Sequence, residues 1–394
     1  MKELSIFATP YNISDEYSVY VGNIDSDKII KIIETTTPKA DKVCIICDDN
    51  ISSLYFNSLR DELVADNKED FQGFYFDIAQ RLFENSFEVI ICTLPHGDEN
   101  KSLENSQYIL SLLEENDFTR DDLIFSIGGG MIGDISGFSA SIYKRGINVI
   151  HLPTTLLSMI DSCIGGKTAI NFGNSKNSVG TFYNPCYVAV SPVFLETLPE
   201  KELLSGLGEA VKYSIIEKFY MVQSSHDSFD QFEVEDSIFN VIRKLLCKKI
   251  AHSDVVNLIY RCLRIKKFFV EKDPFDLSIR KFLNLGHTIG HCIETLSDYE
   301  VPHGKAVLMG ISHMLKVSLK GNLISENFAS RYFDLINTIG ISRNFQYSIS
   351  QICSQICKDK KVSNGEISLI LPCEACGVQE VAISLDDVHE FLSI

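Results

Sequence analysis

Three histidines and one carboxylate have the side-chain types and spacing of a metal site. His287 and His291 lie four residues apart in NLGHTIGHCIE, which puts them on one face of a helix, and His303 follows in VPHGKAV. Far upstream, Glu209 shares a helical face with Lys212 in GLGEAVKY. Two or three histidines with a carboxylate form a typical zinc site that can leave one position open for a substrate. Spacing alone leaves open which histidines bind the metal, because many helical histidines are structural.

A glycine-rich stretch within residues 122–180 has the features of an anion-binding site. Leu123–Ile127 is an apolar run typical of a buried strand, three glycines follow at 128–130, and Met131–Tyr143 has apolar residues at helical spacing. A helix N-terminus after a glycine turn offers unpaired N–H groups to a phosphate. The stretch therefore predicts a diphosphate site, although a tight turn needs the same glycines.

Polar and cationic residues follow these glycines. Asp134 lies one turn into the predicted helix, and Lys144 and Arg145 end it. Thr154 and Thr155 cap the next strand. We expect one glycine-punctuated loop to hold Asp161, Lys167, Lys176 and Asn177. Four cationic side chains in one segment of an acidic protein predict a site for a phosphorylated or carboxylated small molecule.

The composition indicates a globular protein with two domains. The 394 residues are 45% hydrophobic, which suffices for a sizeable core. The 53 acidic and 36 basic residues give a formal charge of -17, which argues against a nucleic-acid surface. The sequence opens without a signal-peptide pattern, and no run approaches the length of a membrane span. We expect a cytoplasmic protein whose partners include neither nucleic acid nor membrane.

Twelve cysteines include two C-x-x-C pairs, Cys44/Cys47 and Cys373/Cys376. The first pair lies in the apolar run VCIIC, where cysteine serves as a small hydrophobic residue. The two pairs are too far apart in sequence for a usual zinc ribbon. We therefore expect reduced thiols rather than a cysteine-bound metal.

Strand-like and helical segments divide the chain into two parts. Five strand-like runs alternate with helical or polar stretches: Val43–Cys47, Phe87–Cys92, Leu123–Ile127, Val149–Leu152 and Tyr187–Val190. This alternation predicts a parallel sheet wrapped by helices. After Pro192, segments with 3.6-residue periodicity dominate from Lys201 to Ile339, with an acidic exposed loop at His226–Asp236 and a strand-like run at Ile367–Leu371. The prediction is an α/β fold with a Rossmann-like parallel-sheet domain over residues 1–193 and a mainly α-helical domain over residues 194–394.

The motifs resemble, in their order, those of the 3-dehydroquinate synthase family of sugar-phosphate cyclases. The resemblance extends from about Asp48 to Lys361. It rests on GGGMIGD, RGINVIHLPTTLL, DSCIGGKTAIN, KNSVGTFYNP, FLETLPEKE, GEAVKY, RKFLNLGHTIGH and HGKAV. It implies a dehydroquinate synthase-like fold, with NAD bound in the N-terminal domain and metal and substrate in the C-terminal one.

The resemblance implies two cofactors. By correspondence with the family, Glu209, His287 and His303 bind Zn²⁺ or Co²⁺, whereas His291 is catalytic rather than a ligand. The implied NAD contacts are Asp48, Asp49, Asn50, Asp98, Lys101, Gly129, Gly130, Asp134, Thr154, Thr155, Lys176, Phe194 and Thr197.

The resemblance also implies how the substrate is held. The implied substrate contacts are Arg145, Asp161, Lys167, Asn177, Lys212, Lys266, Arg280, Asn284 and Lys361. Among them, Arg145 reaches across a homodimer interface. Lys266 and Arg280 face the carboxylate of a seven-carbon keto acid, which a cationic fork favours. Lys212, Asp276 and His291 are the implied catalytic residues.

The implied reaction is a lyase step of the shikimate pathway to aromatic amino acids. It converts the phosphorylated sugar acid 3-deoxy-D-arabino-heptulosonate 7-phosphate to 3-dehydroquinate and phosphate. Transient oxidation by NAD acidifies a C–H bond so that phosphate can leave, after which the hydride returns. The ring then opens, and an intramolecular aldol reaction closes the carbocycle.

Four positions depart from the family pattern: Ser205, Asp276, Ser278 and Lys305. They leave open another cyclase of secondary metabolism, such as an aminodehydroquinate synthase or a 2-deoxy-scyllo-inosose synthase. Against the latter, Asn284 stands where those enzymes tend to have Glu. A metal-dependent polyol dehydrogenase would share the fold and cofactors, but it would release NADH and need no cluster of phosphate- and carboxylate-binding groups.

Overall fold

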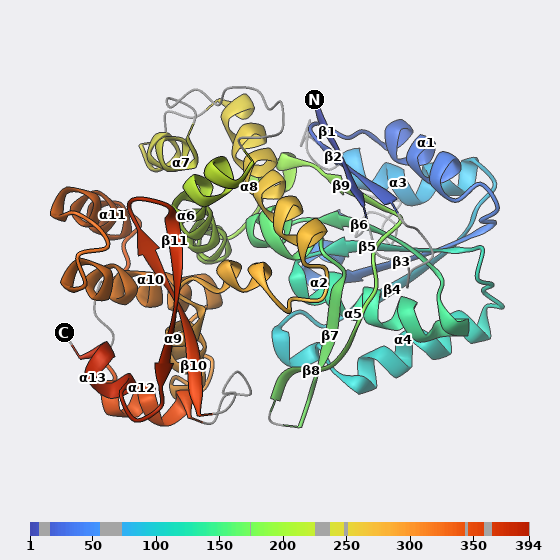
Figure 1. The fold of residues 1–394 in the computed structure, drawn as a ribbon. Coiled ribbons are helices and arrows are strands. Elements are labelled where there is room, and N and C mark those ends of the chain that lie inside the picture. Colours follow the sequence, from blue (N-terminus) through green and yellow to red (C-terminus); the bar gives the residue numbers. More distant parts are fainter. Residues whose placement is uncertain are drawn as a thin grey trace. The chain divides into compact units, whose positions relative to one another are not determined.

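The computed structural model describes residues 1–7, 16–55, 73–173, 175–224, 237–247, 251–342, 346–357 and 365–393. The chain forms two compact units, Met1–Leu198 and Pro199–Ile394 (Figure 1). The sequence placed this boundary after residue 193, so Phe194 and Thr197 fall in the first unit instead of the second. Lys361 and the acidic stretch 226–236 lie outside the described residues.

A seven-stranded sheet forms the centre of the first unit. Its strands are β1 (Lys2–Phe7), β2 (Glu16–Val21), β3 (Lys42–Asp48), β4 (Glu88–Leu94), β5 (Leu123–Gly128), β6 (Asn148–Pro153) and β9 (Tyr187–Val190). They lie in the order β1-β2-β9-β6-β5-β3-β4, and every neighbouring pair except β1 with β2 is parallel. All five strands expected from apolar runs occur in this parallel sheet, which confirms the α/β fold.

The direction of strand addition reverses between β3 and β5. The chain crosses from β3 to β4 on one side, and from β5 to β6 and β9 on the other. The register pairs Asp48 with Leu94 and Gly128 with Pro153, so the carboxyl ends of β3, β4, β5 and β6 meet along one edge. Open parallel sheets bind ligands outside their carboxyl ends at such a reversal. Most of the predicted NAD contacts follow these strand ends.

Helices cover the faces of this sheet (Figure 1). They are α1 (Ser26–Thr36), α2 (Asp49–Tyr55), α3 (Gly73–Glu84), α4 (Leu103–Glu115) and α5 (Gly130–Ile142), with short turns η2 (Asp98–Asn100), η3 (Tyr143–Arg145), η4 (Ser158–Ser162) and η5 (Pro192–Glu196). Ile109 of α4 and Ile135 of α5 pack in one core with Cys44 and Cys92 of the sheet. Burial raises the pKa of Cys92 to about 12. Cys44 is therefore a core hydrophobic residue, as expected, and Cys92 packs in the same core.

A two-stranded hairpin replaces the loop that we expected after residue 161. β7 (Lys167–Phe172) and β8 (Ser175–Phe182) pair antiparallel, so Lys176 and Asn177 lie on a strand. The loop prediction was wrong because β8 is exposed along most of its length and lacks the alternation of a half-buried strand. Asn177 has a φ of 51°, in the left-handed region, which directs its side chain out of the regular strand pattern.

The second unit is mainly helical, as predicted. It contains α6 (Glu200–Gln223), α7 (Ile238–Leu246), α8 (His252–Lys272), η7 (Ile279–Asn284), α9 (His287–Leu296), α10 (His303–Lys320), α11 (Glu326–Thr338), α12 (Ile349–Ile356), the hairpin β10 (Glu366–Cys373) and β11 (Gly377–Ser384), and α13 (Val388–Leu392). α10 packs against both α6 and α9. None of the described helices, in either unit, combines the length and apolarity that crossing a membrane requires.

Candidate functional site

The second unit brings the three predicted metal ligands together. Glu209 lies in the middle of α6, while His287 and His303 are the first residues of α9 and α10. Nε2 of His287 is 3.4 Å from Oε1 of Glu209, and Nε2 of His303 is 3.3 Å from the same oxygen. One ligand atom of each residue lies within 4.8 Å of the others. A carboxylate and two imidazoles at such distances fit a divalent metal ion of the zinc type.

Glycines allow the helices that carry these residues to meet. A Cβ built on Gly304 would overlap the backbone of Ser205, and one on Gly208 would overlap the backbone of Gly304. The backbones of α6 and α10 therefore touch next to Glu209 and His303. Ser205, which departs from the family pattern, accepts a hydrogen bond from the N–H of Gly304 at 3.2 Å. This bond satisfies one unpaired donor at the start of α10.

The Nδ1 atoms of both ligand candidates have hydrogen-bond acceptors. Nδ1 of His287 lies 3.1 Å from the carbonyl oxygen of Leu285, and Nδ1 of His303 lies 3.2 Å from Oε2 of Glu294. A ring that donates from Nδ1 keeps a lone pair on Nε2, the atom that faces Glu209. In their neutral forms both rings would therefore offer Nε2 to a metal ion.

The pKa values of the two rings move in opposite directions. Burial lowers the pKa of His287 to about 3, which leaves its ring neutral. Burial acts in the same sense on His303, but hydrogen bonds to Glu209 and Glu294 outweigh it and raise the pKa to about 10. We favour the neutral form of both rings in the working site, because a divalent cation between Glu209 and His303 would replace the proton.

His291 and Lys212 flank this cluster. The ring centroid of His291 lies 5.4 Å from that of His287 and 6.0 Å from that of His303. His291, Glu294 and His303 form a second group of ligand atoms within 4.8 Å of one another. Lys212 is almost fully buried, and its Nζ lies 2.5 Å from Oε2 of Glu209.

The predicted carboxylate-binding residues lie on two packed elements. Lys266 is buried on α8, and Arg280 and Asn284 lie on η7, which packs against α8. The guanidinium of Arg280 donates to the carbonyl oxygen of Pro274 at 2.7 Å. The two cations therefore lie on packed elements of one unit.

A buried carboxylate shapes the loop before η7. Asp273 accepts backbone N–H bonds from Leu277, Ser278 and Arg280 at 2.6 to 3.0 Å. Burial would raise the pKa of Asp273, but these donors lower it. Asp276 lies inside this loop with a φ of 58°. The loop conformation therefore depends on Asp273, which sequence patterns did not single out.

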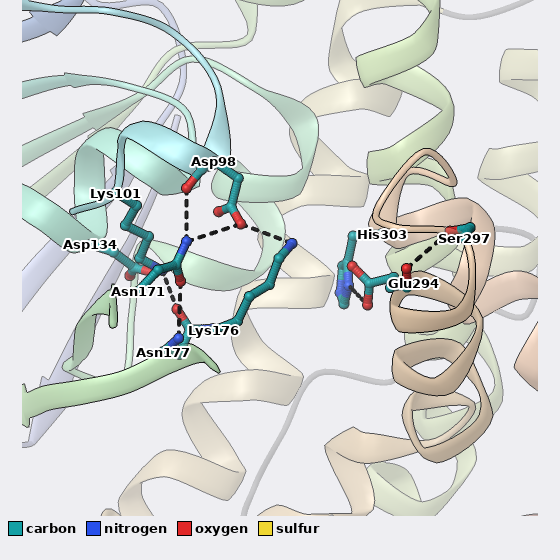
Figure 2. Close-up of polar contacts among 9 residues, drawn as sticks. All are labelled: Asp98, Lys101, Asp134, Asn171, Lys176, Asn177, Glu294, Ser297 and His303. Carbon is teal, nitrogen blue, oxygen red and sulfur yellow. Dashed lines mark hydrogen bonds and ion pairs between the residues drawn. The ribbon is translucent and has the colours of Figure 1, made fainter. Parts of the chain in front are cut away.

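The first unit carries a connected polar network (Figure 2). Lys101 is nearly fully buried, and its ammonium contacts Asp134 and Asn177. Asp98 accepts from Lys176 at 2.8 Å. Burial would raise the pKa of Asp98, but Lys176 and Lys101 lower it, so this carboxylate stays charged. Predicted NAD contacts and one predicted substrate contact thus form one network.

Asn171 of β7 links the two segments of this network. Its side-chain nitrogen donates to the carbonyl oxygen of Asp98 at 2.8 Å, and its Oδ1 accepts from the backbone N–H of Asn177 at 3.0 Å. Its own N–H donates to the carbonyl oxygen of Lys101 at 2.7 Å. Asn171 therefore holds the β7–β8 hairpin against the η2 turn. We did not predict this role, and only its place in TAIN near other polar residues could have suggested it.

The predicted phosphate and nucleotide contacts lie at the carboxyl edge of the sheet. Gly129 is the N-cap of α5 and Gly130 begins it, so the helix N-terminus opens at the end of β5. Thr154 and Thr155 follow β6, and the N–H of Thr154 donates to the carbonyl oxygen of Gly128 at 2.9 Å. Asp48 ends β3, where Oδ1 accepts from the N–H of the third following residue at 2.9 Å. The strand ends thus present backbone donors and polar side chains together.

Side-chain contacts bring two outlying segments to this edge. His96 donates its backbone N–H to Asp49 at 3.0 Å, which ties the segment after β4 to the start of α2. Tyr55 contacts Thr197 through their hydroxyls at 2.5 Å, and its ring packs edge-on against Phe194 at 5.5 Å. α2 therefore carries Asp49 and Asn50 at one end and anchors η5 at the other.

A small hollow lies next to the glycine turn. Gly129, Asp134 and Lys167 line it, together with His151, which we did not predict. His151 is buried, and its Nδ1 has no hydrogen-bond partner among the described residues. Burial lowers its pKa to about 4. The remaining predicted contacts of this unit are Asp161 in η4 and Arg145, which ends η3 in an exposed position.

The sequence matches one protein family in both halves. Residues 91–205 match the family model described as 3-dehydroquinate synthase N-terminal, and residues 206–362 match the one described as 3-dehydroquinate synthase C-terminal. The chain is 34% identical over 380 residues to a 3-dehydroquinate synthase of Alkaliphilus metalliredigens, with 96% of each chain covered. It is 35% identical over 381 residues to a 3-dehydroquinate synthase of Francisella tularensis subsp. mediasiatica, covering 94% of this chain and 95% of that protein.

Solved structures of other cyclases share the fold. A 2-deoxy-scyllo-inosose synthase complexed with carbaglucose-6-phosphate, NAD⁺ and Co²⁺ aligns with a TM-score of 0.76 at 21% identity, with 99% of each chain covered. A 2-epi-5-epi-valiolone synthase from Streptomyces hygroscopicus subsp. jinggangensis 5008, with NAD⁺ and Zn²⁺ bound, aligns with a TM-score of 0.71 at 20% identity, covering 90% and 91%. At these identities the likeness is one of fold, and it confirms the predicted architecture.

Proposed function

The chain belongs to the 3-dehydroquinate synthase family, and we propose that it converts 3-deoxy-D-arabino-heptulosonate 7-phosphate to 3-dehydroquinate and phosphate. It is an NAD- and metal-dependent lyase. The observation that carries the proposal is the convergence of Glu209, His287 and His303, from three separate helices, in a chain that matches the family in both halves. The product places the reaction in the shikimate pathway.

Glu209, His287 and His303 would hold a zinc or cobalt ion. The support is that both imidazoles turn Nε2 toward one carboxylate oxygen and donate from Nδ1 elsewhere. When bound, the metal polarises a substrate hydroxyl and NAD takes up and returns a hydride. Lys212 keeps a positive charge beside this site, which favours an anionic substrate.

The carboxyl edge of the first unit's sheet would bind NAD. Gly129 and Gly130 open α5 without a side chain in the way, so its backbone N–H groups can bind the diphosphate. Asp48, at the end of β3, suits a ribose hydroxyl. The Lys101 network would fix the segments on which the other cofactor contacts lie.

Lys266 and Arg280 would bind the substrate carboxylate, because both cations are buried on packed elements of one unit. This pairing distinguishes a seven-carbon keto acid from glucose 6-phosphate, which has no carboxylate. His291, next to both ligand histidines, would transfer a proton during phosphate elimination, and Asp276 would assist from its loop. Lys167 and Asn177 would contact the substrate from the hairpin.

The active form would be a cytoplasmic homodimer in which Arg145 completes the phosphate site of the neighbouring subunit. The support is the exposed position of Arg145 at the end of η3 and the family resemblance. Sedimentation of the purified protein at assay concentration tests this assembly. A fully active monomer would contradict it.

One incubation tests the proposed reaction. Purified protein is mixed with Zn²⁺, a small amount of NAD and the heptulosonate phosphate, and both phosphate and the carbocyclic product are measured. We expect phosphate in large excess over NAD, because the hydride is returned in each turnover. Glucose 6-phosphate and glycerol serve as alternative substrates in parallel. Faster phosphate release from glucose 6-phosphate would indicate an inosose synthase, and NADH accumulation with glycerol would indicate a polyol dehydrogenase.

A further inference from the structure

The carboxylate of Glu294 lies against the imidazole of His303 (Figure 2). Glu294 is on α9, seven residues after His287, and only 6% of its surface is exposed. Its Oε2 is 3.2 Å from Nδ1 of His303, while Nε2 of the same ring is 3.3 Å from Oε1 of Glu209. The ring of His303 is thus held between two buried carboxylates.

The two ring nitrogens of His303 have different roles toward a metal ion: one contacts Glu294 and the other faces Glu209. A neutral imidazole that donates from Nδ1 to Glu294 has its lone pair on Nε2, which faces Glu209 and can therefore coordinate an ion. Histidine ligands commonly donate their second N–H to a carboxylate, which fixes the ring and makes the ligand nitrogen more basic. His287 achieves the same tautomer with the carbonyl oxygen of Leu285. A carbonyl has no full charge, so the two ligands are supported unequally.

We propose that Glu294 is a positioning residue of the metal centre, which orients His303 and strengthens its Nε2 as a ligand without binding the ion itself. This inference rests on the proposed metal site of Glu209, His287 and His303. It goes further by assigning a task to a buried carboxylate outside the predicted contacts.

A second assignment would make Glu294 a ligand, in the group with His291 and His303. The orientation of His303 argues against it. Its Nδ1 contacts Glu294, and its Nε2 contacts Glu209. The group around Glu209 instead uses Nε2 of two histidines that converge on a single carboxylate oxygen. Glu209 is also fully buried, whereas His291 is partly exposed.

Zinc affinity tests the inference without catalysis. The full-length wild-type protein, Glu294→Gln and Glu294→Met are stripped of metal and titrated with Zn²⁺ in competition with a chromophoric chelator. Gln keeps the shape and a neutral acceptor, and Met removes the acceptor. We expect Zn²⁺ affinity to fall about 10-fold for Gln and about 100-fold for Met, the range known for partners of ligand histidines. The visible spectrum of the Co²⁺ form should keep the wild-type ligand set in the Gln variant.

Glu217→Gln is the matched control. Glu217 is a buried carboxylate of α6 in the same unit, and it binds Arg261 at 2.6 and 2.8 Å. This variant should lose thermal stability yet keep wild-type Zn²⁺ affinity. That result would separate general damage to the fold from a specific effect on the metal.

Three outcomes would overturn the inference. Zn²⁺ affinity within twofold of wild type in both Glu294 variants would show that the contact does not support the ligand. Retained metal in Glu209→Gln, with metal lost in the Glu294 variants, would make Glu294 a ligand. Neither of these two outcomes affects the activity of the wild-type protein, so the proposed function would survive them. A wild-type protein that binds no Zn²⁺ or Co²⁺ would instead refute the metal site and remove the basis of the inference with it.

Discussion

Replacing Gly304 with Ala should separate the helices that carry the metal ligands. The added Cβ would overlap the carbonyl oxygen of Ser205 and lie 2.5 Å from its carbonyl carbon and 2.6 Å from its Cα. Non-bonded carbon atoms pack at about 3.5 to 4.0 Å, so α10 must retreat from α6 by about 1 Å. Both contacts are with backbone, and no side-chain rotation can relieve them. His303, directly before Gly304, moves with the helix.

The size of the effect follows from this displacement. Overpacking a core typically costs about 1 to 3 kcal/mol, and a backbone clash belongs at the upper end, so we expect the free energy of unfolding to fall by about 3 kcal/mol. Metal ligands tolerate distance errors of only about 0.2 Å. Moving Nε2 of His303 away from Glu209 by several times that amount should weaken Zn²⁺ binding by at least about 100-fold.

Two measurements test the prediction: urea unfolding of the metal-free protein, and Zn²⁺ affinity by chelator competition. Gly321→Ala is the control, because Gly321 ends the same helix and its added Cβ would meet only ordinary contacts of 3.4 to 3.9 Å. We expect that variant to stay within about 0.5 kcal/mol of wild type and to bind Zn²⁺ normally. A Gly304→Ala protein with wild-type stability and Zn²⁺ affinity would show that the close helix contact does not position His303.

Three further predictions concern other parts of the site. Asn171→Ala should raise the KM for both NAD and substrate by about 10-fold, because Asn177 and the η2 turn lose a shared partner. The control Ser178→Ala loses only a bond within β8 and should keep the wild-type KM values. Wild-type KM values in Asn171→Ala would refute the link. Arg280→Ala should lower kcat/KM for the seven-carbon acid by an amount equivalent to about 1.5 to 3 kcal/mol of binding free energy, which is the contribution of a charge-assisted hydrogen bond. An unchanged kcat/KM would rule out carboxylate binding by Arg280. His151 has a folded pKa of about 4 against 6.5 when unfolded, so the unfolded chain binds more protons between these values and stability falls as pH drops through this window. As the pH falls through this window, the free energy of unfolding of the wild type, measured with urea, should drop by up to about 3 kcal/mol more than that of His151→Gln. If the difference in unfolding free energy between the two proteins does not change with pH, burial of His151 does not have this effect.

The sequence predicted the central sheet well because its parallel strands are covered on both faces. Such strands appear as continuous apolar runs, and Val43–Cys47 of β3 is buried without interruption. β7 and β8 were missed for the opposite reason. β8 is exposed along most of its length and leaves no periodic pattern, and β7 is short and buries only Thr168 and Ile170. The hairpin matters because its residues contact Asp98 and Lys101. These are tertiary contacts, which local sequence patterns do not predict.

The metal set illustrates what helical spacing can and cannot predict. The interval from His287 to His291 correctly indicated two side chains on one face of α9. It could not show that Glu209 would approach His287 and His303, because that depends on backbone contact between α6 and α10. Family resemblance supplied the pairing that periodicity left open. Glu294 carried no signal by itself, since a glutamate late in an amphipathic helix is usually solvated.

The charges around His303 give a second reason to expect a role for Glu294. His287 and His303 begin α9 and α10, so the positive ends of two helix dipoles point toward the cluster. Lys212 adds a full positive charge at the same place. These positive charges would repel a divalent cation unless buried negative charge balanced them. The charge of Glu209 is already balanced by Lys212. Glu294 provides the next carboxylate, so its removal should weaken metal binding even where the ring of His303 keeps its orientation.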